Sequence, residues 1–167
     1  RIYGMKRGLD FIADRQNTIT EENLHQLYQI STGDYLPDED RLLPDHFYRH
    51  DVVYVVDGEE SREGLPAQQL PDAMKRLVDF ANAKDGINEL HKAAILHFSF
   101  AYYHPYFDGN GRTARLLHLW YLVQQGYPAA LFTPFSRYIA ESKAAYYKAY
   151  DRVEKNALIS GYTDVTP

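Results

Sequence analysis

A segment that is apolar on nearly every side places the strongest constraint on the fold of this chain. The segment Arg112–Gln125 is followed by Gly126, with Pro128 just beyond, which is typical of a helix end. Its large apolar side chains are Leu116, Leu117, Leu119, Trp120, Leu122 and Val123. On a helix they point in almost every direction, so other elements have to surround it. The segment therefore predicts a helical bundle around a central buried helix.

Helix signals elsewhere supply the elements that would surround this centre. Thr20 is a typical N-cap residue, two glutamates follow it, and Ile19 can pack on Leu24 across the helix start. From Leu70 to Ala81 the apolar side chains repeat at helical spacing. The further predicted helices run from Thr20 toward Gly33, over 70–81, over 88–103 and over roughly 137–156.

One short segment between these helices has the character of β-structure. Residues 34–50 contain two prolines and predict a long loop. The sequence DVVYVVDGEE follows, with β-branched residues ahead of Asp57-Gly58, a pair typical of a hairpin turn. A lone hairpin is only marginally stable, so it has to lean on the helices. The expected fold is all-α with one small hairpin.

Length and composition narrow the class of protein. The chain has 167 residues, the size of one domain, and starts at Arg1 rather than methionine, so we expect one domain over 1–167 within a longer protein. It contains no cysteine, which suits a reducing compartment and a cytoplasmic location. The net charge of −5 argues against binding to nucleic acid. No apolar run approaches the ~20 residues that span a membrane.

The segment HPYFDGNGRTAR, residues 104–115, joins chemical groups that rarely occur together. Gly109 and Gly111 let a backbone approach a ligand closely, and they stand where a loop becomes the buried helix. The first N–H groups of a helix have no partner inside it, and the positive end of the helix dipole lies behind them. This arrangement predicts an anion site.

Charged side chains complete the predicted site. Arg112 and Arg115 lie three residues apart, on one helix face, and can bind phosphate oxygens. Asp108 offers the carboxylate that Mg²⁺ takes together with phosphates. His104 can act as a general base. Each residue alone has a commoner structural explanation, but their combination predicts a nucleotide site, and one that lacks the Gly-Lys-Ser/Thr of a P-loop.

The motif resembles the signature of the Fic-domain family, His-x-Phe-x-Asp/Glu-Gly-Asn-Gly-Arg-x-x-Arg. The segment FYRHDVVYV also resembles the flap hairpin on which these proteins dock their targets, FSRYIAESKAAYYKAY their closing helix, and RIYGMKRGLDFIA their first core helix. The likeness covers roughly residues 20–155 and implies a Fic-type bundle. One position departs, because Tyr106 stands where the family has phenylalanine. That position is a core anchor, so the added hydroxyl should need a partner while the chemistry stays intact.

The resemblance implies a protein adenylyltransferase, which moves AMP from ATP to a Ser, Thr or Tyr hydroxyl of a target protein. It implies that His104 takes the proton of the incoming hydroxyl and that Asp108 holds Mg²⁺ between the α- and β-phosphates. For the rest of the nucleotide it implies Gly109 and Gly111 as a backbone anion hole, Asn110 for orienting the α-phosphate, Arg112 for the β-phosphate and Arg115 for the γ-phosphate.

Two further surfaces follow from the resemblance. The flap residues Tyr48, Val52, Val53, Tyr54 and Val55 are expected to pair with an extended target segment through main-chain hydrogen bonds, with Val53 facing outward. The alternative is a hairpin that merely covers the core. Tyr146 and Tyr147, with Tyr138, could line an adenine slot, although tyrosines at helical spacing more often belong to a core.

Alternative activities stay open from the sequence. Relatives of this fold transfer a γ-phosphate or a phosphocholine, but the phosphate-transferring ones have lysine where this chain has Gly111. A nucleotide-binding regulatory module with little turnover is a further alternative. The segment Thr18–Asn23 formally matches the inhibitory pattern Ser/Thr-x-x-x-Glu-Gly/Asn, yet a helix cap explains the same residues. We therefore expect an inhibitory segment upstream of Arg1 or on a partner chain.

Overall fold

The computed structural model describes residues 2–57 and 60–160. The chain forms two compact units, which meet in sequence between Leu131 and Phe132. The first unit contains α1 (Ile2–Ala13), α2 (Glu21–Ser31), β1 (Tyr54–Asp57), β2 (Glu60–Glu63), α3 (Leu70–Asn82), α4 (Glu89–Tyr103) and α5 (Asn110–Gln124). Short 3-10 turns occur at Gly33–Tyr35, Asp38–Asp40, Ala67–Gln69 and Pro128–Phe132. The expected all-α fold with one small hairpin is confirmed.

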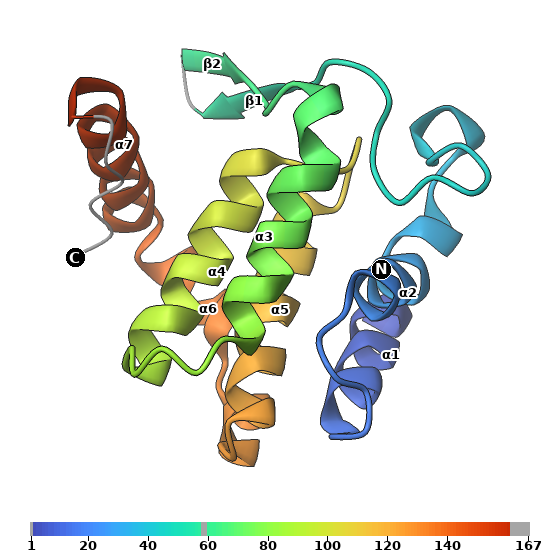
Figure 1. Cartoon of the computed structure of the whole chain (residues 1–167), viewed down its shortest axis with the longest axis vertical. Helices are drawn as coiled ribbons and strands as arrows, with labels where there is room; N and C mark the ends of the chain where they lie inside the picture. Colours follow the sequence, from blue (N-terminus) through green and yellow to red (C-terminus); the bar gives the residue numbers. More distant parts are fainter. Residues whose placement is uncertain (1, 58–59, 161–167) are drawn as a thin grey trace. The chain divides into compact units, whose positions relative to one another are not determined.

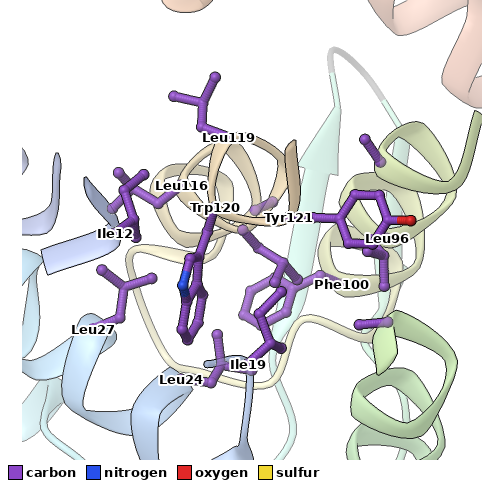
Figure 2. Close-up of a cluster of buried hydrophobic side chains, with 14 of the residues drawn as sticks. Ile12, Ile19, Leu24, Leu27, Leu96, Phe100, Leu116, Leu119, Trp120 and Tyr121 are labelled. Atoms are coloured by element: carbon purple, nitrogen blue, oxygen red, sulfur yellow. The ribbon is translucent and has the colours of Figure 1, made fainter. Parts of the chain in front are cut away.

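Helix α5 is the central element of the first unit. It packs most extensively on α4 and also contacts α1 and α2. Trp120 is fully buried, and its indole N–H donates to the carbonyl oxygen of Asn17 at 2.8 Å. Figure 2 shows this indole among side chains that include Ile12, Leu27 and Phe100. The prediction of a buried central helix is confirmed, but α5 begins two residues earlier than expected, at Asn110.

The start of α2 follows the sequence prediction closely. The Thr20 hydroxyl accepts a hydrogen bond from the backbone N–H of Asn23 at 3.0 Å, which is an N-cap bond. Ile19 and Leu24 are both buried in the core, as the staple requires. The cap therefore accounts for the residues that formally match the inhibitory pattern, and the location of an inhibitory segment stays a prediction.

The hairpin is shorter than the sequence suggested. Strand β1 begins at Tyr54, so residues 51–53 precede it, and it pairs with β2 in antiparallel register with Tyr54 opposite Glu63. The predicted turn residue Gly58 lies outside the described residues. The hairpin lies at the C-terminal end of α4 (Figure 1), where the Arg62 guanidinium donates to the Tyr102 carbonyl at 3.0 Å.

The second unit contains two helices where one was predicted over 137–156. These are α6 (Phe135–Glu141) and α7 (Lys143–Ser160), and they are separated at Ser142. The Ser142 hydroxyl donates to the carbonyl oxygen of Tyr138 at 2.5 Å, and its backbone N–H donates to the same oxygen at 3.0 Å. A serine that bonds the preceding turn in this way competes with a continuous helix.

No helix in the described part of the chain combines the length and the apolar character needed to cross a lipid bilayer.

Candidate active site

His104 lies directly after α4, at the point where the chain turns back toward α5. Its backbone is left-handed, with φ 53° and ψ 60°, and its side chain is half-buried. Its ring nitrogen Nδ1 lies 3.3 Å from the carbonyl oxygen of Ala101. Because a carbonyl only accepts, Nδ1 has to carry the proton in this contact. The other nitrogen, Nε2, is then the one that can accept a proton.

The surroundings of His104 keep its ring neutral. Burial lowers the pKa of His104 below its usual 6.5, and the positive charges of Arg62 and Arg49 lower it further. The Ala101 carbonyl and the charge of Asp108 oppose this shift. A lowered pKa leaves the imidazole unprotonated at neutral pH, which is the state that a general base needs.

The amide of Asn110 fixes the loop between His104 and α5. Its oxygen Oδ1 accepts from the backbone N–H of Tyr106 at 2.9 Å, and its nitrogen Nδ2 donates to the Tyr106 carbonyl at 2.8 Å. Asn110 is 2% exposed. Its side chain therefore holds the loop, and its role in orienting an α-phosphate stays a prediction.

The N-terminus of α5 has the geometry of an anion site. Gly109 precedes it in the left-handed conformation, with φ 82°, and its carbonyl accepts the first helical bond from Thr113 at 2.9 Å. The N–H groups of Asn110, Gly111 and Arg112 have no acceptor within the helix. Gly111 is exposed, so this end of the helix is open to a ligand. These N–H groups can bind phosphate oxygens.

Both predicted phosphate-binding arginines lie at this end of α5. Arg112 donates from Nη1 to the Ser31 carbonyl at 3.1 Å and to the Thr32 hydroxyl at 3.2 Å. These bonds tie it to the end of α2. Nη1 of Arg115 lies 3.5 Å from the point where a Cβ on Gly111 would stand. Sequence reasoning missed Ser31 and Thr32, because nothing in their spacing connects them with a residue 80 positions away.

Asp108 stands beside the same helix end. It is exposed, and its Oδ1 accepts from the backbone N–H of Gly109 at 2.6 Å. No group of three or more histidine, aspartate or glutamate side chains within residues 2–57 and 60–160 is placed to hold a metal ion. A Mg²⁺ ion commonly takes only one or two carboxylates and completes its shell with phosphate oxygens and water. One exposed carboxylate next to an anion site fits that donor set.

Tyr106 is a core residue, as predicted for this position of the motif. It is fully buried and stacks on Tyr28, with ring centroids 3.7 Å apart and an angle of 21° between the planes. The expected partner for its hydroxyl is not found, because neither of the two hydroxyls has a hydrogen-bond partner among the described residues. Burial raises the pKa of Tyr106, so the phenol stays neutral. Stacking, and not a hydrogen bond, holds this ring.

The other predicted contact residues come before or after the motif in the sequence. Tyr48 is half-buried ahead of the hairpin, and its hydroxyl donates to Glu21 at 2.6 Å, so it supports α2 and is not part of the flap strand. Tyr146 and Tyr147 are on α7 in the second unit, with their rings 5.4 Å apart at 79°. Their role at adenine stays a prediction.

Comparison with known proteins decides the family. A model of the Fic/DOC family matches residues 18–122. The chain belongs to the Fic/DOC family. The Fic signature predicted at 104–115 lies inside the matched region, as do the hairpin and all of α5 except its last two residues.

Curated relatives of this Fic protein are named protein adenylyltransferases. The chain is 30% identical to protein adenylyltransferase fic-1 of Caenorhabditis elegans over 122 residues, which are 58% of this chain and 24% of the relative. It is 28% identical to protein adenylyltransferase Fic of Nematostella vectensis over 137 residues, 78% of this chain and 30% of the relative. The chain thus spans less than a third of either relative.

Solved structures share the fold. A Fic family protein from Desulfovibrio desulfuricans superposes with a TM-score of 0.76 at 21% identity, over 92% of this chain and 46% of the other. A Fic domain containing signaling protein from Bacteroides thetaiotaomicron gives 0.73 at 24% identity, over 92% and 56% of the two chains. These similarities confirm the Fic-type bundle.

Proposed function

We propose that this Fic chain transfers AMP from ATP to a hydroxyl side chain of a target protein. One observation carries the proposal: the basic nitrogen of His104 lies one short loop away from the open N-terminus of α5. A general base beside an anion site is what attack of a hydroxyl on a phosphate ester requires. The names of the curated relatives support the same activity.

The position of each group supports the role that we propose for it. The free N–H groups at the start of α5 hold phosphate oxygens, and Arg112 and Arg115 neutralise the charge of the β- and γ-phosphates. Asp108 would hold Mg²⁺, which would add further positive charge at the phosphates. Nε2 of His104 takes the proton of the target hydroxyl while its oxygen attacks the α-phosphorus. The bond to the β-phosphate oxygen breaks, and pyrophosphate leaves.

The experiment that tests this activity uses ATP labelled at either the α- or the γ-phosphate. Purified protein is incubated with each form, Mg²⁺ and a cell lysate, and protein-bound label is measured. We expect label from the α-phosphate only. Label from the γ-phosphate only would show a kinase instead. No label from either form would favour a nucleotide-binding module, or an enzyme that transfers another group, such as phosphocholine, from a different nucleotide.

We also propose that the outer edge of β1 docks the target. The N–H of Gly64 donates to the carbonyl of Val53 at 3.0 Å, so the main chain of Val53 faces the partner strand. This corrects the prediction that Val53 faces outward. In an antiparallel pair the pattern alternates, so the main-chain groups of Tyr54 and Val56 face the open edge. Their side chains are 64% and 72% exposed. An extended segment can add to such an edge.

Val56→Pro should therefore slow target modification about tenfold while leaving self-modification unchanged, because proline removes one outward N–H. Val56→Ala, which keeps that N–H, is the matched control and should retain both rates. The measurement is the initial rate of label incorporation into target and into the protein itself. Equal losses of both rates in Val56→Pro would mean that the hairpin has a structural role only.

A further inference from the structure

Arg49 is a buried charge that the reaction scheme above does not use. It precedes the hairpin and is 3% exposed. Within the described residues no carboxylate is shown paired with it; its guanidinium donates to backbone carbonyls instead. A buried guanidinium is costly unless its donors are satisfied, and here they are satisfied by main-chain oxygens.

The carbonyls that Arg49 binds belong to three segments. Nε donates to the oxygen of His104 at 2.7 Å, and Nη1 donates to that of Asp51 at 2.7 Å. Nη2 donates to the oxygen of Leu65 and, at 3.4 Å, to that of Tyr103. One planar group therefore joins the segment before β1, the segment after β2 and the end of α4.

The bonds reach α4 where its own hydrogen bonds run out. The last carbonyls of a helix have no intrahelical donor and carry the negative end of the helix dipole. The backbone N–H of Arg49 adds a further bond, to the oxygen of Pro105 at 2.9 Å. Arg49 thus holds the main chain at 103, 104 and 105, on both sides of the base.

The hairpin packs against the same residues. A Cβ on Gly64 would stand 2.8 Å from Nη2 of Arg49 and 3.3 Å from the Cβ of His104. Glycine therefore lets the strand end come close to both side chains. One shared set of contacts therefore fixes both the end of the hairpin at Gly64 and the position of His104.

We propose that Arg49 is a positioning residue. It holds the two ends of the flap hairpin against His104, so that a target hydroxyl presented on the flap meets Nε2 at the correct distance. This inference rests on the proposed function. Only a fork of several donors can reach the carbonyls of His104, Asp51 and Leu65 at once, so lysine cannot replace it. A misplaced base lowers the turnover rate without touching the groups that bind ATP.

The test compares Arg49→Lys with the native protein in AMP transfer from α-labelled ATP. We expect kcat to fall ~10–100-fold, with the KM and Kd for ATP unchanged. Lys92→Met is the control for lost stability: Lys92 is also buried and binds Ala83 and Asp85, but it lies about 18 Å along α4 from His104. Its kcat should be native. A native kcat in Arg49→Lys, or an equal fall in Lys92→Met, would overturn the proposal.

Two further measurements keep the proposal testable. Gly64→Ala pushes a methyl group against the guanidinium without removing the charge, and it should lower kcat in the same way. It serves as the test if Arg49→Lys does not fold. Nitrogen NMR of the imidazole, with His104→Gln to identify the signal, should show Nδ1 protonated in the native protein and mixed tautomers in either variant. If the native protein transfers no AMP, the proposed function fails. The NMR measurement does not depend on that activity, and unchanged tautomers of His104 in both variants would overturn the role of Arg49.

Discussion

His104→Ala is expected to reduce AMP transfer by about 10²–10⁴-fold while leaving ATP affinity near its native value. The ring supplies the basic nitrogen Nε2, and its partner Nδ1 is held by the Ala101 carbonyl. Alanine removes that nitrogen but leaves the N–H groups at the start of α5 in place. Transfer rates with α-labelled ATP and calorimetric titration with ATP measure the two effects separately.

His91→Ala is the matched control, since His91 is exposed on α4, the helix that ends directly before His104. It should keep the native rate. Retained transfer in His104→Ala would remove the assigned base, and a parallel loss of ATP binding would mean that the ring holds the nucleotide.

The same assignment fixes the sign of the pH dependence. The base works as neutral imidazole, and burial lowers the pKa of His104 below 6.5, so the neutral form persists to lower pH than in an exposed histidine. The rate should be flat near neutral pH and fall only as the pH drops below 6.5.

Gly109→Ala should lower the free energy of unfolding by about 2–5 kcal/mol and weaken ATP binding as well. The residue has φ 82°, which an L side chain adopts at a cost of roughly 1–2 kcal/mol. A Cβ there would also stand 2.4 Å from Cγ2 of Thr32, which is 2% exposed. Overpacking of this kind adds about 1–3 kcal/mol. Moving Thr32 also disturbs Arg112, which bonds its hydroxyl.

Gly86→Ala separates the two causes. Gly86 has a similar φ of 75°, but a Cβ there would meet nothing within 4 Å. It should therefore show the backbone cost alone, with ATP affinity unchanged. Urea unfolding and ATP titration of both variants give the comparison. Equal destabilisation by the two substitutions would rule out the contact with Thr32 as a source of strain.

Local features of the sequence predicted much of this fold. A helix that is apolar all round can only be central, and Trp120 is fully buried as that argument requires. The cap at Thr20 uses residues within four positions of each other, so its bond to Asn23 could be read directly from the sequence. The left-handed backbone of Gly109, just before α5, was not predicted, although glycine is the residue that adopts it most readily.

Long-range contacts could not be predicted in this way. Arg112 binds the end of α2 and Arg49 binds the end of α4, across 80 and 55 positions of sequence. No periodicity marks such pairs, because they depend on which segments the bundle brings together. The direction of Val53 was also wrong, since strand register depends on the pairing with β2 and not on composition.

The two hydrogen bonds between the Asn110 side chain and the Tyr106 backbone fix the length of the loop. The amide oxygen of Asn110 accepts from the N–H of Tyr106 and the amide nitrogen donates to its C=O, four positions earlier in the sequence. An inserted or deleted residue between them would break both bonds together, whereas an exchange of the exposed side chain at 108 would break neither. Evolution can therefore vary the chemistry of this loop more easily than its length. Searches for diverged members should hold the spacing fixed and let the identities change.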